Sequence, residues 1–289
     1  MTSRAALLRK RVRASILLTL NASSIYWKYI RRRKIENLWW AVRSPKVSNS
    51  YKKSRRLEEI FYAELFAQNS VSRVFDIGGN NGDKTDIFLA CGARHIVLVE
   101  PDPYWSDIHK WRFAKNKKVQ ICRIAVSSEK GIASLQRFYP GCPLNTLEQK
   151  WVETLASDNS RFDKRTIEDA PIIDTVTFKW LAEEYGFPDY AKIDVEGHES
   201  RVVAGMEEAP RLLSLEFNLP EFEQELIENI KTLPSKSPNC VMNFVIDYEK
   251  GFELVNWVTP VDMLGILSKK DLRYLELFVR AGLRACPDG

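Results

Sequence analysis

Short apolar runs rich in β-branched residues recur along the chain from residue 74 onward, each bounded by polar or turn-forming residues. A strand buried on both faces of a parallel sheet has this continuous apolar pattern. The runs predict strands at 74–78, 95–100, 119–126, 191–195, 212–217, 243–247 and 273–279.

Helices are expected between the first five of these strands. Apolar residues follow helical spacing in Lys84–Cys91, Tyr104–Lys115, Phe178–Tyr185 and Glu199–Met206. A stripe of apolar residues at Leu57, Ile60, Phe61 and Leu65 predicts one more helix ahead of the first strand. Alternating strands and helices are typical of βαβ units, so we expect an α/β fold whose mostly parallel sheet is covered on both faces.

The last strands follow a different pattern. No clear helix separates them, and Lys250-Gly251 lies between two apolar runs, as in a hairpin turn. We therefore expect the sheet to end in an antiparallel tip. The longest stretch without an assignment is Arg137–Ala170, with a helical piece around Leu147–Leu155. It is either a lid or binding loop or a plain surface insertion.

The first 54 residues differ from the rest in charge and pattern. Residues 1–56 hold sixteen Lys and Arg against one acid, a net +15, so residues 57–289 carry about −10 of the whole chain's +5. Leu8, Val12, Ile16 and Leu20 recur every fourth position and predict one apolar helical face. We expect a basic, partly helical extension at 1–54, able to lie on an anionic membrane surface, and a catalytic domain at 55–289.

Composition narrows the class and the location. The 289 residues are 45% hydrophobic and 28% charged, which is typical of globular proteins and excludes collagen-like, mainly disordered and multi-span membrane chains. The apolar run Ala14–Leu20 is shorter than the roughly 20 residues that span a bilayer. Five irregularly placed cysteines lack zinc-ligand spacing, so we expect a reducing, cytoplasmic location and no metal.

A glycine turn follows the first predicted strand, in the order Asp76-Ile77-Gly78-Gly79-Asn80-Asn81-Gly82. In an open α/β sheet this turn borders the ligand crevice. A dinucleotide fingerprint would place glycine at 80 and 83, where this chain has Asn80 and Asp83, and no Walker loop occurs. Asp83 at the helix start would also disfavour a phosphate, so NAD and ATP are not expected.

Glu100 ends the second strand, where nucleotide-binding sheets place an acid on the ribose hydroxyls. A glycine turn with such an acid suits an adenosine ligand without phosphate, and S-adenosylmethionine is the common one. A tight turn beside an ordinary acid is the structural alternative.

Acids and a histidine gather after the fourth βαβ strand, in Lys192-Ile193-Asp194-Val195-Glu196-Gly197-His198-Glu199. The carboxyl ends of parallel strands share one edge, so this cluster should lie beside the glycine turn. Asp194, Glu196 and His198 are the candidate catalytic bases, with no choice among them. Glu216 and Asn218 end the next strand and are candidate substrate-binding residues; two acids do not specify a metal.

The chain resembles the FkbM family of S-adenosylmethionine-dependent methyltransferases over roughly 73–279. The resemblance rests on the glycine turn, Glu100-Pro101-Asp102, Ala125-Val126-Ser127 and above all the 192–199 block. The resemblance implies a Rossmann-like, seven-stranded fold, S-adenosylmethionine as methyl donor, and O-methylation of a hydroxyl on a sugar, glycan or other metabolite. By matching position it implies cofactor binding by Asp76, Gly78, Gly79, Asn80, Gly82, Glu100, Pro101, Asp102 and Ala125. Asn81, Asp83 and Lys84 depart from the family's pattern, as does the basic extension.

Two other functions remain open. A nucleic-acid methyltransferase usually carries an N/D-P-P-aromatic turn after the fourth strand, where this chain has Asp194-Val195-Glu196-Gly197, so nucleic acid is not expected as a partner. The other is a catalytically inactive methyltransferase fold that binds through the basic extension. The sequence specifies neither the acceptor nor the oligomeric state.

Overall fold

The computed structural model describes residues 49–157 and 166–282. The chain divides into two units, Met1–Arg56 and Leu57–Gly289. The predicted apolar face of the basic extension therefore lies outside the described residues. Within the described ranges, no helix has the length and apolar character needed to cross a membrane.

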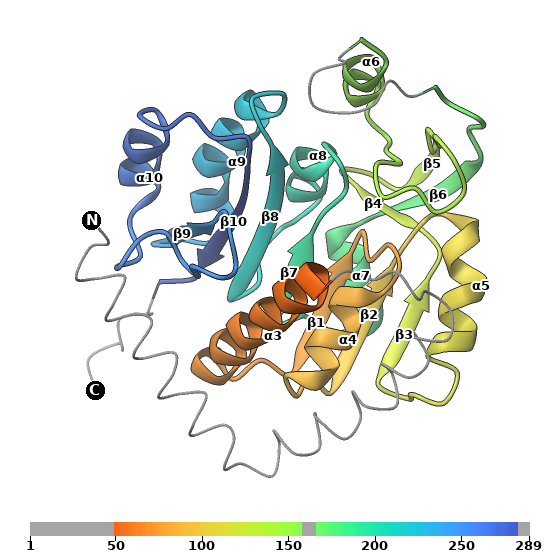
Figure 1. Ribbon diagram of the computed structural model, residues 1–289, viewed down its shortest axis with the longest axis horizontal. Coiled ribbons are helices and arrows are strands. Elements are labelled where there is room, and N and C mark those ends of the chain that lie inside the picture. Colours follow the sequence, from red (N-terminus) through yellow and green to blue (C-terminus); the bar gives the residue numbers. More distant parts are fainter. Residues whose placement is uncertain (1–48, 158–165, 283–289) are drawn as a thin grey trace. The chain divides into compact units, whose positions relative to one another are not determined.

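Seven strands form the main sheet, in the order β3-β2-β1-β7-β8-β10-β9 (Figure 1). Its strands are β1 (Arg73–Ile77), β2 (His95–Val99), β3 (Val119–Cys122), β7 (Tyr190–Ile193), β8 (Leu212–Asn218), β9 (Val241–Val245) and β10 (Tyr274–Arg280). β1 pairs in parallel with β2 and β7, and β10 runs antiparallel to both β8 and β9. The predicted mostly parallel sheet with an antiparallel tip is confirmed.

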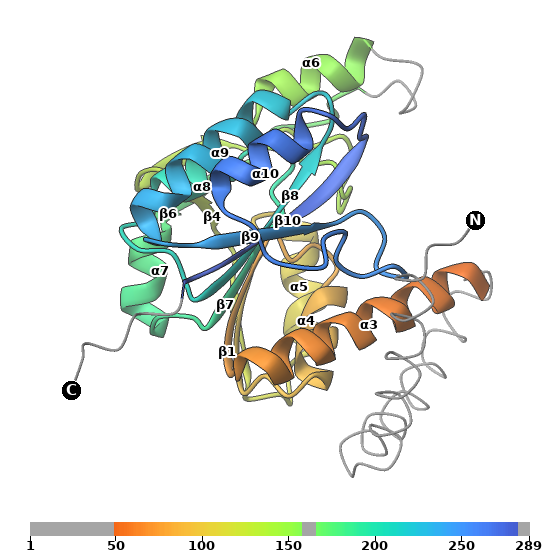
Figure 2. The same cartoon turned by 90° about the vertical axis from the view of Figure 1, so that its left-hand side faces the viewer.

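Helices cover both faces of the main sheet, as predicted (Figure 2). One face packs on α3 (Asn49–Asn69) and α4 (Asp83–Ala90), through residues such as Phe61, Tyr62 and Phe88, with α5 (Pro103–Arg112) beside β3. The other face packs on α7, α8, α9 and α10. These are α7 (Phe178–Tyr185), α8 (Glu199–Ala204), α9 (Glu223–Lys236) and α10 (Pro260–Leu267).

The expectation that no helix separates the last strands was wrong. α9 lies between β8 and β9, and α10 lies between β9 and β10. The turn at Lys250-Gly251 exists, because both N–H groups donate to the carbonyl of Asp247. However, the returning chain forms only an isolated bridge, Met242 with Val258, before entering α10. The antiparallel tip is thus made by a helical crossover, not by a hairpin.

The run 119–126, predicted as one strand, is divided between two sheets. β3 belongs to the main sheet, whereas β4 (Ala125–Ser127) joins a second, three-stranded sheet in the order β4-β6-β5. Its other strands are β5 (Gly131–Ser134) and β6 (Ile172–Thr177). β4 pairs in parallel with β6, which draws the chain away from the main sheet after Arg123. Between β5 and β6, the predicted helical piece is α6 (Gln149–Ser157).

Candidate active site

The glycine turn lies between β1 and α4, against the turn that follows β7. Gly78 and Gly82 have φ angles of 78° and 80°, which favour glycine. A Cβ added at Gly78 would lie 1.7 Å from the carbonyl oxygen of Asp194, so only glycine lets the two turns approach. The N–H groups of Gly78 and Gly79 donate to the Val99 carbonyl at 2.9 and 3.0 Å, which fixes the turn at the end of β2.

Glu100 connects the glycine turn to the end of β2. Its Oε2 accepts from the backbone N–H of Asn80 and its Oε1 from that of Asp102, both at 2.8 Å. The residue is buried, and burial raises the pKa of the carboxyl to about 7, although these two hydrogen bonds act in the opposite direction. Glu100 therefore titrates in the neutral range while facing the cleft.

Asp102, a cofactor-binding residue by the family resemblance, accepts four hydrogen bonds from the chain itself. Asp102 is the N-cap of α5, and its Oδ1 accepts from the N–H of Tyr104 and from Nη1 of Arg137. Its Oδ2 accepts from the N–H of Gly141 and from Nδ2 of Asn145. All four contacts are 3.0 Å or shorter. A carboxylate has about four acceptor positions, so those of Asp102 are filled by the protein. Asp102 anchors the segment 137–145 beside the cleft and does not line it.

Asp76 lies beneath the glycine turn on β1. Its Oδ2 accepts from Oγ1 of Thr85 at 2.6 Å, and Oδ1 has no hydrogen-bond partner in the described part of the chain. Burial raises the pKa of Asp76 to about 6, opposed mainly by Lys192 on the adjacent strand. Asp76 therefore supports the turn from below, outside the cleft lining.

The turn after β7 presents the predicted catalytic residues. Asp194, Glu196 and His198 all line the cleft. Glu196 has a φ of 52°, a left-handed conformation that redirects its side chain toward Asn218, whose Nδ2 donates to Glu196 Oε2 at 3.3 Å. Burial, followed by the charge of Asp194, raises the pKa of Glu196 well above its usual value.

His198 is held through both ring nitrogens. Nδ1 contacts Glu148 Oε1 at 2.5 Å and Nε2 contacts Ser127 Oγ at 2.9 Å. Glu148 precedes α6, so His198 connects that segment to the turn after β7. Thr146 adds a second connection by donating from Oγ1 to the Glu196 carbonyl at 2.8 Å. Glu199 closes the same turn by accepting from the Val195 N–H and is buried.

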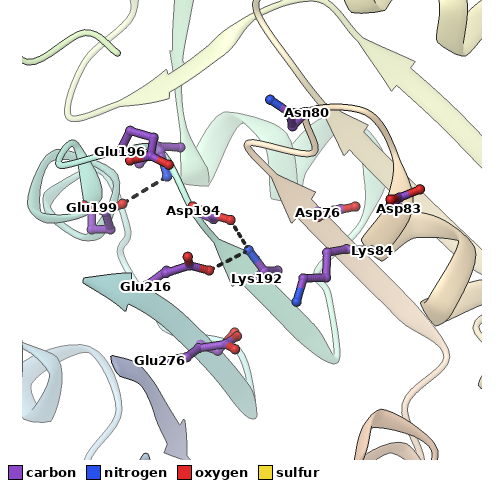
Figure 3. Close-up of polar contacts among 12 residues, drawn as sticks. Asp76, Asn80, Asp83, Lys84, Lys192, Asp194, Glu196, Glu199, Glu216 and Glu276 are labelled. Carbon is purple, nitrogen blue, oxygen red and sulfur yellow. Dashed lines mark hydrogen bonds and ion pairs between the residues drawn. The ribbon is translucent and has the colours of Figure 1, made fainter. Parts of the chain in front are cut away.

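Lys192 and Glu216 complete the polar edge (Figure 3). Lys192 on β7 is buried and contacts both Asp194 and Glu216, and Glu216 faces the cleft from β8. Burial, then Asp194, raises the pKa of Glu216 to about 7. The two constellations predicted from sequence thus lie at one sheet edge, as expected for adjacent parallel strands.

The cleft brings most of the predicted residues together. Those that line it are Gly78, Asn80, Glu100, Pro101, Ala125, Asp194, Glu196, His198 and Glu216. The other predicted residues lie next to the cleft and contact lining residues or support the turns. They are Asp76, Gly79, Gly82, Asp102 and Asn218. One wall was not located from sequence. It comes from β4 with the residue before it and from the segment after β5, and its residues are Ile124, Val126, Leu135, Cys142, Pro143, Asn145, Thr146 and Leu147. Its sequence signals were the block Ala125-Val126-Ser127 and the length of the unassigned segment 137–170.

The fold and this edge define a methyltransferase of class I with a Rossmann-like fold. Residues 76–251 match the family model of the methyltransferase FkbM domain, and the chain belongs to this family. None of the curated proteins matches it.

Solved structures similar to the chain include other methyltransferases. An O-methyltransferase from Bacillus cereus, in complex with SAH, is 10% identical with a TM-score of 0.37 and covers 89% of this chain and 91% of its own. The StiE O-MT is 10% identical with a TM-score of 0.42, over 85% and 82%. A precorrin-6y C5,15-methyltransferase from Geobacter metallireducens is 9% identical with a TM-score of 0.37, over 78% and 87%.

Proposed function

We propose that this methyltransferase uses S-adenosylmethionine to O-methylate a hydroxyl group of a sugar, glycan or secondary metabolite. The observation that carries the proposal is the position of Glu100, which faces the cleft from the end of β2 and is hydrogen-bonded to the glycine turn.

The acceptor capacity of Glu100 fits the ribose of this cofactor. An ionised carboxylate offers about four acceptor positions, and the N–H groups of Asn80 and Asp102 use two of them. Two positions remain for the two hydroxyls of an unphosphorylated ribose. In the described part of the chain, no Lys or Arg lines the cleft, so a phosphate would find no cation there. This favours S-adenosylmethionine over NAD and ATP.

When bound, S-adenosylmethionine supplies an activated methyl group, and the chain's own residues must orient the acceptor and take its hydroxyl proton. His198 has both ring nitrogens engaged, and Glu196 accepts a hydrogen bond from Asn218 while burial raises the pKa of its carboxyl. Asp194 faces the cleft with Lys192 behind it, and Glu216 is beside it. We therefore assign proton removal to Asp194, with Glu196 and Asn218 as hydrogen-bonding groups for the acceptor.

Calorimetry with the purified chain tests cofactor binding. S-adenosylmethionine and its demethylated product should bind, and NAD and ATP should bind at least tenfold more weakly. Glu100→Ala should lose about 1–3 kcal/mol, the contribution of hydrogen bonds to a charged group. No binding of either adenosyl ligand by the folded wild type would contradict the proposal.

The acceptor can be found in cells that lack the gene, where mass spectrometry should detect a metabolite lighter by one methyl group. The purified chain should then transfer a labelled methyl group to that compound. A methyl ether resists mild alkali and a methyl ester does not, so alkaline treatment checks O-methylation of a hydroxyl. Asp194→Asn should retain binding of S-adenosylhomocysteine, which lacks the sulfonium charge, while kcat falls by about 10²–10⁴. Unchanged turnover would exclude Asp194 as the base.

A further inference from the structure

A single ammonium group lies between two carboxylates at the cleft (Figure 3). Nζ of Lys192 lies 2.5 Å from Oδ2 of Asp194 and 3.5 Å from Oε2 of Glu216. The Lys192 side chain is 2% exposed, whereas those of Asp194 and Glu216 are 24% and 22% exposed. Each carboxylate thus has the ammonium on its inner side and the cleft on its outer side.

Lys192 stays charged in this position. Burial alone would lower its pKa, but Asp194 and Glu216 raise it well above the usual value. Glu216, in contrast, has a pKa raised to about 7, by burial and then by Asp194. With Asp194 ionised, the three groups together are neutral when Glu216 holds a proton and carry one negative charge when it does not.

Other titratable groups also face Glu216. They come from every neighbouring element and are Lys84 on α4, Glu196 and Glu199 after β7, Tyr248 after β9, and Tyr274 and Glu276 on β10. The other cation among them, Lys84, is paired with Glu58, and its Nζ donates to the Tyr248 hydroxyl at 3.2 Å. Lys192 is the cation in contact with Glu216.

We propose that Lys192 is a positioning residue that sets the charge which Asp194 and Glu216 present to a cationic ligand in the cleft. The shared ammonium holds the two carboxylates together and lets Glu216 ionise beside an ionised Asp194. The inference rests on the proposed function, because the cationic ligand is the sulfonium of S-adenosylmethionine.

Two stable probes separate this charge effect from the rest of binding. Sinefungin carries an amine in place of the methyl sulfonium, and S-adenosylhomocysteine is neutral at that position. The ratio of their Kd values, measured by calorimetry from pH 5.5 to 8.5, cancels contributions that both ligands share, including the contact with Glu100. No acceptor is needed.

The wild type should prefer sinefungin more strongly as pH rises, by about tenfold, with a midpoint near pH 7. Lys192→Met should move this midpoint upward by at least about 1 pH unit, the effect of losing an opposite charge at this distance, so that the variant's ratio does not reach its plateau by pH 8.5. Lys192→Arg keeps the cation and should keep the midpoint within about half a unit. Glu216→Gln should abolish the pH dependence of the ratio. Lys84→Met is the control, a second lysine near Glu216 that is half-buried and paired with Glu58, and it should move the midpoint less than Lys192→Met.

A wild-type ratio that is flat with pH would overturn the inference, as would a Lys192→Met midpoint that does not move or that Lys84→Met matches. A purely structural Lys192 would weaken both probes equally and leave the midpoint unchanged. If Lys192→Met does not fold, Lys192→Arg and Glu216→Gln test the inference. It is overturned if Lys192→Arg loses the midpoint or if Glu216→Gln keeps it. Absence of binding of either probe to the wild type would instead overturn the proposed function.

Discussion

Ligand binding should depend on pH through Glu100. Burial raises the pKa of this carboxyl from 4.5 to about 7 in the folded chain. The ionised form has two acceptor positions left for a ribose, because two are used by backbone N–H groups. Protonation removes acceptor capacity and adds a donor facing the ligand's hydroxyls. Affinity for S-adenosylhomocysteine should therefore rise with pH through 7 and level off above about 8.

The size of the effect follows from proton linkage. Below pH 7, binding to the ionised form releases one proton, so Kd increases about tenfold for each unit by which the pH falls. At pH 5.5, affinity should be about 30-fold weaker than the plateau, which corresponds to about 2 kcal/mol at 1.36 kcal/mol per unit.

Calorimetry at several pH values, in buffers of different ionisation enthalpy, measures both Kd and the number of protons released. Glu100→Gln should bind about 1–3 kcal/mol more weakly at pH 8 and lose the pH dependence. Glu199→Gln is the matched control, because Glu199 is also buried with a pKa of about 8 but lies outside the cleft lining. It should keep the wild-type pH dependence. The reasoning is refuted if the wild type shows no dependence, or if Glu100→Gln retains it.

Three further outcomes are expected. Gly78→Ala should lower the free energy of unfolding by about 2–4 kcal/mol and abolish S-adenosylhomocysteine binding, because the new Cβ would meet the Asp194 carbonyl. Wild-type stability of this variant in chemical denaturation would contradict the prediction. Burial raises the folded-state pKa values of Glu59, Glu100 and Glu199 to about 8, 7 and 8. A carboxyl with a raised folded-state pKa contributes stability that is lost as pH rises, so the ligand-free chain should melt at least about 4 °C lower at pH 8.5 than at pH 5.5. Scanning calorimetry at the two pH values measures this difference. We propose that the basic extension binds anionic membranes, so the full chain should float with vesicles that contain phosphatidylserine. The bound fraction should fall at least tenfold in 0.5 M salt, and it should also fall when Gln replaces Arg31, Arg32, Arg33 and Lys34. Equal binding to neutral vesicles would exclude this role.

Much of the sheet was predictable because its parallel strands are buried on both faces. Ile96–Val99 is a continuous apolar run and Val74–Ile77 is interrupted only by Asp76, and the order of the strands along the chain determines most of the pairing. α9 was missed although Leu226, Ile230 and Leu233 follow helical spacing, since Pro234 lies inside the helix. α10 carries a Thr259 cap and Pro260 at its first turn, both typical of a helix start.

The candidate site was predictable only where it follows the sheet edge. Asp194 and Glu216 end adjacent strands, so their proximity follows from the strand order. The wall from Leu135 to Leu147 could not be located from sequence, because its position depends on contacts distant along the chain. Asp102 reaches Arg137, Gly141 and Asn145, residues 35 to 43 positions away. Nothing in the local pattern indicates that a cap residue of α5 holds the opposite wall.

Unfilled acceptor positions distinguish the acids of this edge better than residue type does. Asp102 and Asp194 both follow buried strands at the same sheet edge. Asp102 receives four donors from the chain and serves the fold, whereas Asp194 contacts the buried Lys192 and faces the cleft. Glu100 lies between these cases, with two positions filled and two open. A carboxylate can act on a ligand only through the positions that its own chain leaves open, which is why we propose ligand contacts for Glu100 and Asp194 and a structural role for Asp102.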